Sequence, residues 1–144
     1  MGIRTCGVVI AFLTIAAAAE MITVEPKDLA AQLQAQGPKP ALFHVGFPVM
    51  YRSRHIPASI FAGPGSKQEG LDALKAAASG LPRDREIVVY CGCCPFDRCP
   101  NVKPALDLLR QMGFKKVRAL NIPTNFAADW VDHGYPAEEG TPAK

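Results

Sequence analysis

The stretch that decides the fold is residues 86–101, with the sequence EIVVYCGCCPFDRCPN. Its β-branched run at residues 87–89 is typical of a strand buried on both faces of a parallel sheet. Four cysteines follow within nine positions. Apolar residues then recur at three- and four-residue spacing through residues 102–112, where Asn101 is placed to cap a helix and Gly113 to close it. The stretch therefore predicts a strand, a cysteine loop and a helix.

The rest of the chain alternates short apolar runs with helical patterns, which favours an α/β domain with a parallel sheet covered by helices. Residues 46–65 are expected to be a loop, because Pro48, Pro57 and Pro64 interrupt any regular period. Further strands are expected at residues 21–24, 41–45 and 117–122, and helices at residues 26–36, at about 69–78, and briefly after Thr124.

Size and composition indicate one globular domain. The chain has 144 residues, of which 49% are hydrophobic and 20% charged, well outside the disordered class. The net charge of +3 is small, and no run of Lys or Arg exceeds the pair Lys115 and Lys116. A nucleic-acid partner is therefore not expected, whereas small anionic substrates are compatible with this charge.

The first residues are typical of a secretory signal peptide. Arg4 supplies a positive charge, residues 7–15 are apolar, and residues 16–19 are small. A buried helix or membrane anchor is disfavoured, because the apolar stretch is shorter than the ~20 residues that span a bilayer. We expect a signal peptide at 1–19, a domain at 20–138 and a disordered tail at 139–144, and hence a periplasmic or secreted protein without stable membrane association. Cys6 then takes no part in the chemistry.

The cysteine loop joins a buried strand to the start of a helix, where open α/β sheets bind ligands. Unpaired backbone N–H groups and the helix dipole favour an anion there, so a loop cysteine is expected to be a thiolate with a lowered pKa. Arg98 adds a positive charge, which Asp97 partly opposes. Such a thiolate can attack the outer sulfur of a donor, hold that sulfur as a persulfide and pass it on.

Five segments resemble the single-domain rhodanese family over nearly all of residues 21–137. They are Ala41–Gly46 with Arg54–Ala58, which are similar to the family's early strand and its "GHIPGA" segment, Val88–Cys91, Leu108–Phe114, and Trp130 with Gly134, Tyr135 and Pro136. The resemblance implies a rhodanese-like α/β fold with a central, mostly parallel five-stranded sheet and helices on both faces. It makes Cys91 the persulfide cysteine and the backbone amides after it the cradle of its substrate. His44 stands where the family usually has Asp.

The resemblance also implies a function. We expect an exported sulfurtransferase that moves a sulfane sulfur from an anionic donor, such as thiosulfate, through the Cys91 persulfide to a thiol acceptor or partner protein. No cofactor or metal ligand is assigned, and Cys99 is a possible resolving thiol. The loop is longer than the family's and carries three extra cysteines, so Cys93, Cys94 or Cys99 remain alternative nucleophiles. The expected active loop is Gly92, Cys93, Cys94, Pro95, Phe96, Asp97 and Arg98.

Three other functions are alternatives to sulfur transfer for a cysteine loop of this kind. A phosphatase loop needs Arg six positions after its cysteine, with five residues between them, and Arg98 does not lie at that distance from Cys91. Four thiols in nine residues could instead hold zinc or copper(I) as soft ligands. A second loop cysteine could also attack a persulfide or mixed disulfide on Cys91, which would make the protein a thiol redox module. Outside the loop, Arg52 and Arg54 are candidates for attracting an anionic donor, and Phe96 for lining the pocket.

Overall fold

The computed structural model describes residues 22–140 and contains a five-stranded sheet in which every strand pair is parallel. The strand order is β1-β5-β4-β2-β3. The strands are β1 (Thr23–Val24), β2 (Ala41–His44), β3 (Ile60–Phe61), β4 (Glu86–Tyr90) and β5 (Lys116–Leu120). The predicted parallel sheet is confirmed, and the predicted signal peptide at 1–19 lies outside the described residues.

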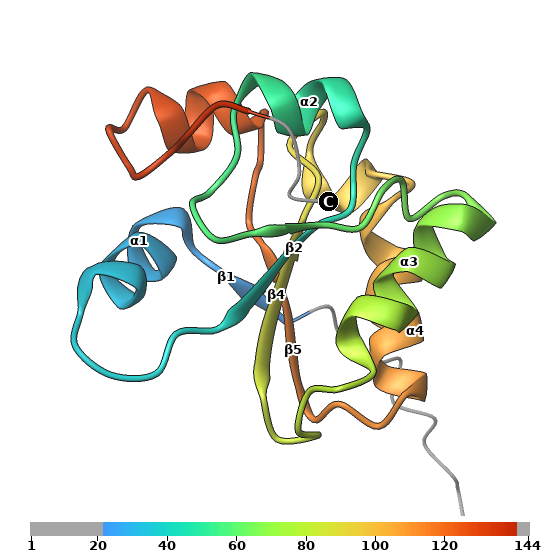
Figure 1. The fold of residues 1–144 in the computed structure, drawn as a ribbon. Coiled ribbons are helices and arrows are strands. Elements are labelled where there is room, and N and C mark those ends of the chain that lie inside the picture. Colours follow the sequence, from blue (N-terminus) through green and yellow to red (C-terminus); the bar gives the residue numbers. More distant parts are fainter. Residues whose placement is uncertain (1–21, 141–144) are drawn as a thin grey trace, which may run out of the picture.

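Helices cover both faces of the sheet, as predicted (Figure 1). Helix α1 lies on one face, α3 and α4 lie on the other, and α2 lies across the carboxyl ends of the strands. The helices are α1 (Pro26–Gln34), α2 (Pro48–Ser53), α3 (Gln68–Ala78) and α4 (Val102–Gln111), with a 3-10 turn at Phe96–Arg98 and a π-helical turn at Ala127–Val131. None of these helices is long and apolar enough to cross a membrane.

Strand β4 is the centre of the core, because alternate residues of a strand point to opposite faces of the sheet. Ile87 and Val89 belong to the apolar cluster that includes residues of α3 and α4, and Cys91 continues on that side. Val88 and Tyr90 belong to the cluster that includes residues of α1. All five are at most 2% exposed, which explains the continuous apolar run without alternation.

The prediction that residues 46–65 form a loop is wrong, because the structure places α2 and β3 there. Pro48 is the first residue of α2, a position where its missing N–H needs no partner. Pro57 and Pro64 lie in the connections on either side of β3. The prolines thus separate short elements rather than prevent them.

The last described residues contact the end of α2. The backbones of His55 and Glu138 exchange two hydrogen bonds of 2.9 Å, and Gly140 N donates to Arg52 O. The side chains of Arg54 and Glu139 form an ion pair at 3.2 Å. The first two residues of the predicted disordered tail, Glu139 and Gly140, are therefore in contact with the domain, whereas residues 141–144 lie outside the described part.

Tyr90 ties the segment after α2 to the end of β4. Its buried hydroxyl accepts a hydrogen bond from Ile56 N at 3.0 Å and shares one with Ser59 Oγ at 2.8 Å. Burial raises the pKa of Tyr90, so the hydroxyl stays neutral. These bonds hold the segment 56–59 against the strand end that carries Cys91.

Replacement of Tyr90 by phenylalanine is expected to lower the free energy of unfolding by about 1–3 kcal/mol, because it leaves the buried Ile56 N–H without a partner. Denaturant unfolding measures this change. Tyr135→Phe is the matched control, since the structure shows no hydrogen bond from that hydroxyl among the described residues. Equal stability of Tyr90→Phe and the unmodified protein would contradict the assigned role.

Candidate active site

The loop after β4 is held in place by the segment that follows β5. Gly92 has φ +87°, and a Cβ there would lie 2.8 Å from Phe126 Cβ, so no other residue fits without displacement. Phe126 N donates to Gly92 O at 3.1 Å, and Phe96 N donates to Ile122 O at 2.9 Å. The direction in which the loop leaves Cys91 is therefore set by contacts distant in sequence.

A pocket of about 490 Å³ opens beside Cys91 at the carboxyl end of the sheet. Of the predicted site residues, Cys91, Gly92 and Cys93 line it. Cys91 is only 2% exposed, whereas Cys93 is exposed. The other lining residues are His44, Met50, Ser53, Arg54, Asn125, Phe126, Ala127 and Val131.

Most of these lining residues could not be found from the sequence. Met50 and Ser53 belong to α2, which occupies the stretch predicted to be a loop. Asn125 and Val131 have side chains common on any surface, and only the fold brings them to Cys91. Arg54 is the exception, because it was a candidate for attracting an anionic donor.

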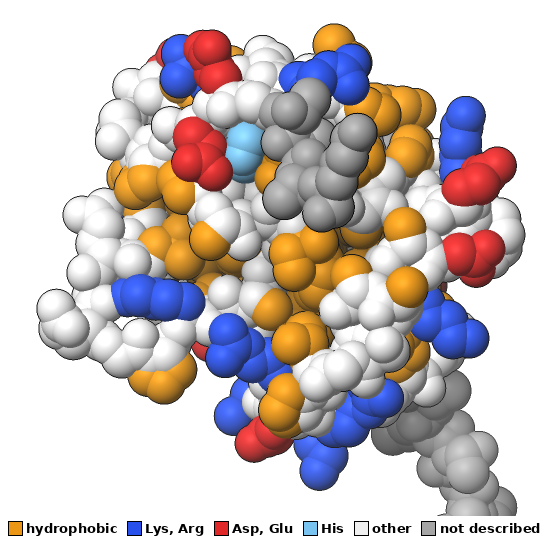
Figure 2. Space-filling view, viewed as in Figure 1, with side chains coloured by type: hydrophobic (Ala, Val, Ile, Leu, Met, Phe, Trp, Pro, Cys, Tyr) orange, Lys and Arg blue, Asp and Glu red, His pale blue; other side chains and the backbone are white. Residues whose placement is uncertain are grey.

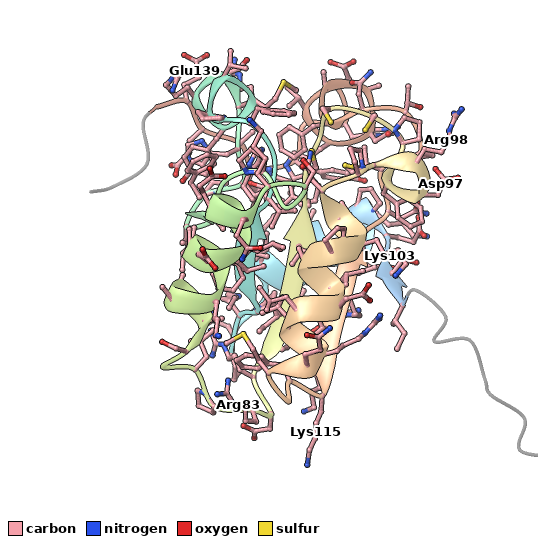
Figure 3. The ribbon with its side chains drawn as sticks, turned by 90° about the vertical axis from the view of Figure 1, so that its right-hand side faces the viewer. Arg83, Asp97, Arg98, Lys103, Lys115 and Glu139 are labelled. Atoms are coloured by element: carbon pink, nitrogen blue, oxygen red, sulfur yellow. The ribbon has the colours of Figure 1, made fainter. Side chains whose placement is uncertain are left out.

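The second half of the predicted active loop does not line the pocket. Cys94 and Phe96 are partly buried against the α3 and α4 side of the core, which is a packing role for Phe96 rather than a pocket wall. Asp97 and Arg98 are exposed and point away from the domain (Figure 3). The cation at the pocket is instead Arg54, whose side chain is 48% exposed.

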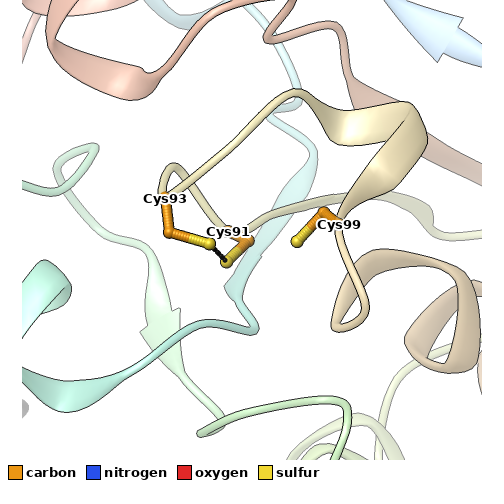
Figure 4. A group of neighbouring side chains, drawn as sticks. All are labelled: Cys91, Cys93 and Cys99. Carbon is orange, nitrogen blue, oxygen red and sulfur yellow. Dashed lines mark hydrogen bonds between the residues drawn. The ribbon is translucent and has the colours of Figure 1, made fainter.

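Three sulfurs of the loop converge. The Sγ atoms of Cys91, Cys93 and Cys99 all lie within 4.8 Å of one another, and we call these three residues the thiol cluster (Figure 4). Cys91 Sγ and Cys93 Sγ are 3.2 Å apart. Cys94 Sγ is 3.2 Å from Cys93 Sγ but is not a member of the mutually close set.

Asn101 occupies the N-cap position of α4, as predicted, but its side chain makes no capping hydrogen bond. Its buried side chain instead donates from Nδ2 to Cys91 Sγ at 3.4 Å and accepts at Oδ1 from Ser66 N at 3.0 Å. The backbone N–H groups of Asn101 and Val102 help to lower the pKa of Cys99, which lies just before the helix start.

The pKa values of Cys99 and Cys91 are shifted in opposite directions, which favours the thiolate on Cys99. Hydrogen bonding from the Cys91 thiol lowers the pKa of Cys99 to about 5, and the N–H groups at the start of α4 add to this effect against the cost of burial. The same hydrogen bond, together with burial, raises the pKa of Cys91. The expectation of a lowered pKa holds for a loop thiol at the helix start, but that thiol is Cys99.

His44 lies beside Cys91 in a confined space. A Cβ on Gly46 would come within 2.8 Å of Cys91 Sγ and 2.9 Å of His44 Cε1, so the glycine makes this proximity possible. Burial, and to a smaller extent the neighbouring His55, lowers the pKa of His44 to about 4. His44 is therefore neutral near pH 7 and adds no charge to the pocket.

Comparisons with known proteins agree with this architecture. A sequence profile described as "Rhodanese-like domain" matches residues 25–121, and no curated protein sequence is significantly similar. The crystal structure of the Alr3790 protein from Anabaena sp. has a TM-score of 0.61 and 25% identity, and the match covers 81% of this chain and 82% of that one.

Two more distant structures share the fold. The single-domain sulfurtransferase RDL2 from Saccharomyces cerevisiae has a TM-score of 0.59 and 17% identity, with 81% of this chain and 94% of that chain covered. A thiosulfate sulfurtransferase from Pseudomonas aeruginosa has a TM-score of 0.61 and 24% identity, with 84% of this chain and 20% of that chain covered. At these identities the likeness establishes the architecture.

The position of the thiolate can be tested by titration. We expect the ultraviolet absorbance of thiolate to be present at neutral pH and to be lost as Cys99 gains a proton when the pH falls through about 5. Because Cys99 carries the charge, Cys99→Ser should remove this low-pH step. Equal neutral-pH thiolate absorbance in Cys99→Ser and the unmodified protein would refute the assignment.

Proposed function

Because the chain belongs to the rhodanese-like domain family, as the sequence predicts, we propose that it is a sulfurtransferase that carries a sulfane sulfur on Cys91. The observation that carries this proposal is the placement of Cys91. It directly follows the buried strand β4 and lies in the wall of a pocket of about 490 Å³. A nucleophile in this position reacts only with donors and acceptors that enter the pocket.

The thiol cluster offers a route to an activated nucleophile. The Cys91 and Cys99 sulfurs lie within 4.8 Å of each other, so Cys99 can accept the Cys91 proton, which leaves Cys91 as the thiolate and Cys99 as the thiol. Asn101 Nδ2, 3.4 Å from Cys91 Sγ, then faces the new negative charge, as does the backbone N–H of Cys93. Cys99 thus takes the role of proton acceptor, in place of the resolving role suggested for it by the sequence.

Sulfur transfer then takes two displacement steps. The Cys91 thiolate attacks the outer sulfur of thiosulfate, so that a new S–S bond forms and sulfite leaves with the electron pair of the broken bond. An acceptor thiolate, or cyanide in an assay, attacks the outer sulfur of the persulfide, and Cys91 leaves as the thiolate. No oxidant or reductant is consumed in either step.

The lining of the pocket favours a small anionic donor. Arg54 is its cation, His44 is neutral, and Met50, Phe126 and Val131 are apolar. Low polarity around a single guanidinium strengthens its attraction for an anion. The ion pair with Glu139 at 3.2 Å moderates that charge.

We further propose that the protein acts after export, in the periplasm or outside the cell, on a thiol acceptor or partner protein and without a nucleic-acid partner. The support is the pattern at residues 1–19 and the modest net charge of +3. On the face that Figure 2 shows, Lys and Arg side chains gather mainly toward the end away from α2, with acidic side chains between some of them.

A thiosulfate and cyanide assay tests the proposal. Cys91→Ser should lower the rate of thiocyanate formation by roughly 100-fold or more, because a serine hydroxyl at this position cannot carry the sulfur as a persulfide. Cys6→Ser, a matched change in the predicted signal peptide, should retain the rate. Unchanged turnover in Cys91→Ser would exclude the proposed carrier.

A further inference from the structure

We infer that Cys91, Cys93 and Cys99 form a three-thiolate binding site for a soft monovalent cation, copper(I). This site goes beyond sulfur transfer; the sequence raised zinc or copper(I) only as an alternative for the whole loop, without choosing the ion or the ligands. Three features of the described chain carry the inference, namely the convergence of the sulfurs, the donors that surround them, and the composition of the ligand set.

The sulfurs already lie near the distances that one ion requires. With metal–sulfur bonds of about 2.3 Å, a trigonal site places its sulfurs about 4.0 Å apart. The three Sγ atoms lie within 4.8 Å of one another, and the closest pair, Cys91 and Cys93, is at 3.2 Å. Adjustments of about 1 Å or less in these separations would bring the sulfurs onto a common ion.

Two of the proposed ligands are buried in the core, and the third is exposed and can rotate toward them. Cys91 follows β4, Cys99 lies close before α4, and both are at most 5% exposed within the same apolar cluster. Cys93 is exposed, so its side chain can turn without disturbing the core (Figure 4). The pair of buried thiols therefore preorganises the site, and Cys93 faces the pocket through which an ion enters.

The surroundings compensate thiolate charge. Asn101 Nδ2 donates to Cys91 Sγ at 3.4 Å, and Cys99 lies three residues before the first residue of α4. Such outer donors orient metal ligands and stabilise their ionised form. Asp97, the acidic residue of the loop, is exposed and points away (Figure 3), so it does not compete as a hard ligand.

The ligand set selects the ion. Thiolates are soft donors and favour copper(I) or zinc, but a structural zinc site takes four ligands. Among the described residues, no further Cys, His, Asp or Glu completes the mutually close group. His44 lines the pocket, but its Nδ1 accepts a hydrogen bond from Gly46 N at 3.3 Å. Three sulfurs without a fourth donor match copper(I).

Copper(I) and a transferred sulfur would compete for Cys91. An ion bound to this sulfur withdraws electron density from the thiolate and blocks the approach of a donor, so one equivalent of copper(I) should abolish sulfur transfer. This consequence rests on the proposed function, whereas the binding site does not.

The experiment measures copper(I) binding to the full chain carrying Cys6→Ser, reduced and kept free of oxygen. Copper(I) is supplied as its complex with a coloured chelator, and loss of the chelator's colour reports transfer to the protein. We expect one copper per chain, and X-ray absorption should show sulfur neighbours only, at about 2.3 Å. Binding of zinc in preference to copper(I), or a nitrogen neighbour, would overturn the assignment.

Single serine variants of the loop test which thiols bind, with circular dichroism to verify that each is folded. Cys93→Ser and Cys99→Ser should each weaken binding at least about 100-fold, since loss of a ligand exceeds the 10–100-fold cost of losing an outer partner. Cys94→Ser is the matched control and should bind as tightly as the parent. The three-thiolate site is refuted if Cys94→Ser loses as much affinity as Cys93→Ser, or if no loop variant loses any.

Sulfur transfer is measured in parallel, without copper. Copper binding in a protein that transfers no sulfur from thiosulfate would leave this site intact and remove the proposed function. Sulfur transfer in a protein that does not take copper(I) from the chelator would leave the proposed function intact and remove the copper site. The two proposals therefore fail separately.

Discussion

Strand β4 is hydrogen-bonded to β2 on one side and to β5 on the other, and helices cover both of its faces. No residue from Ile87 to Cys91 is more than 2% exposed. A strand held in this way can neither slip in register nor bend, because every side chain would leave its cluster. The position of Cys91 follows from this constraint, and the pocket, the thiol cluster and the start of α4 are arranged around it.

The reactivity that we propose for the cysteine loop depends on contacts among its thiols and with Asn101, and not on the charged side chains of the loop. Its conspicuous charges, Asp97 and Arg98, are exposed and face away from the pocket. The backbone N–H groups at the start of α4 instead help to lower the pKa of Cys99. A buried thiol next to a stabilised thiolate is a proton donor and acceptor pair, which suits covalent transfer and, with both thiols ionised, a soft metal ion. The same three sulfurs therefore support both proposals.

The elements that depend on local pattern were predicted from the sequence. The apolar run of β4 and the helical spacing of α4 are strong periodic signals, and together they placed Cys91 correctly at the end of a central strand. The short elements α2 and β3 were missed, because six and two residues carry no usable period. Pro48 was interpreted as a residue that interrupts regular structure, whereas it is the first residue of α2.

The roles of single side chains were harder to predict, because they depend on contacts distant in sequence. Asn101 has the residue type and position of a helix cap, yet Cys91 and Ser66 N bind its amide. The charge on Cys99 depends on three residues meeting at one point, which spacing alone does not reveal. The family resemblance pointed to Cys91 as the nucleophile, but it did not point to Cys99, the neighbour that we propose as its proton acceptor.

The central claim is that Cys91 accepts the sulfur, and mass spectrometry of the reduced protein after brief exposure to thiosulfate tests it most directly. We expect the mass of one added sulfur atom at Cys91, on the peptide that contains the end of β4, and loss of that mass after cyanide. An added sulfur found only on Cys93, Cys94 or Cys99, or on no cysteine of the loop, would contradict it.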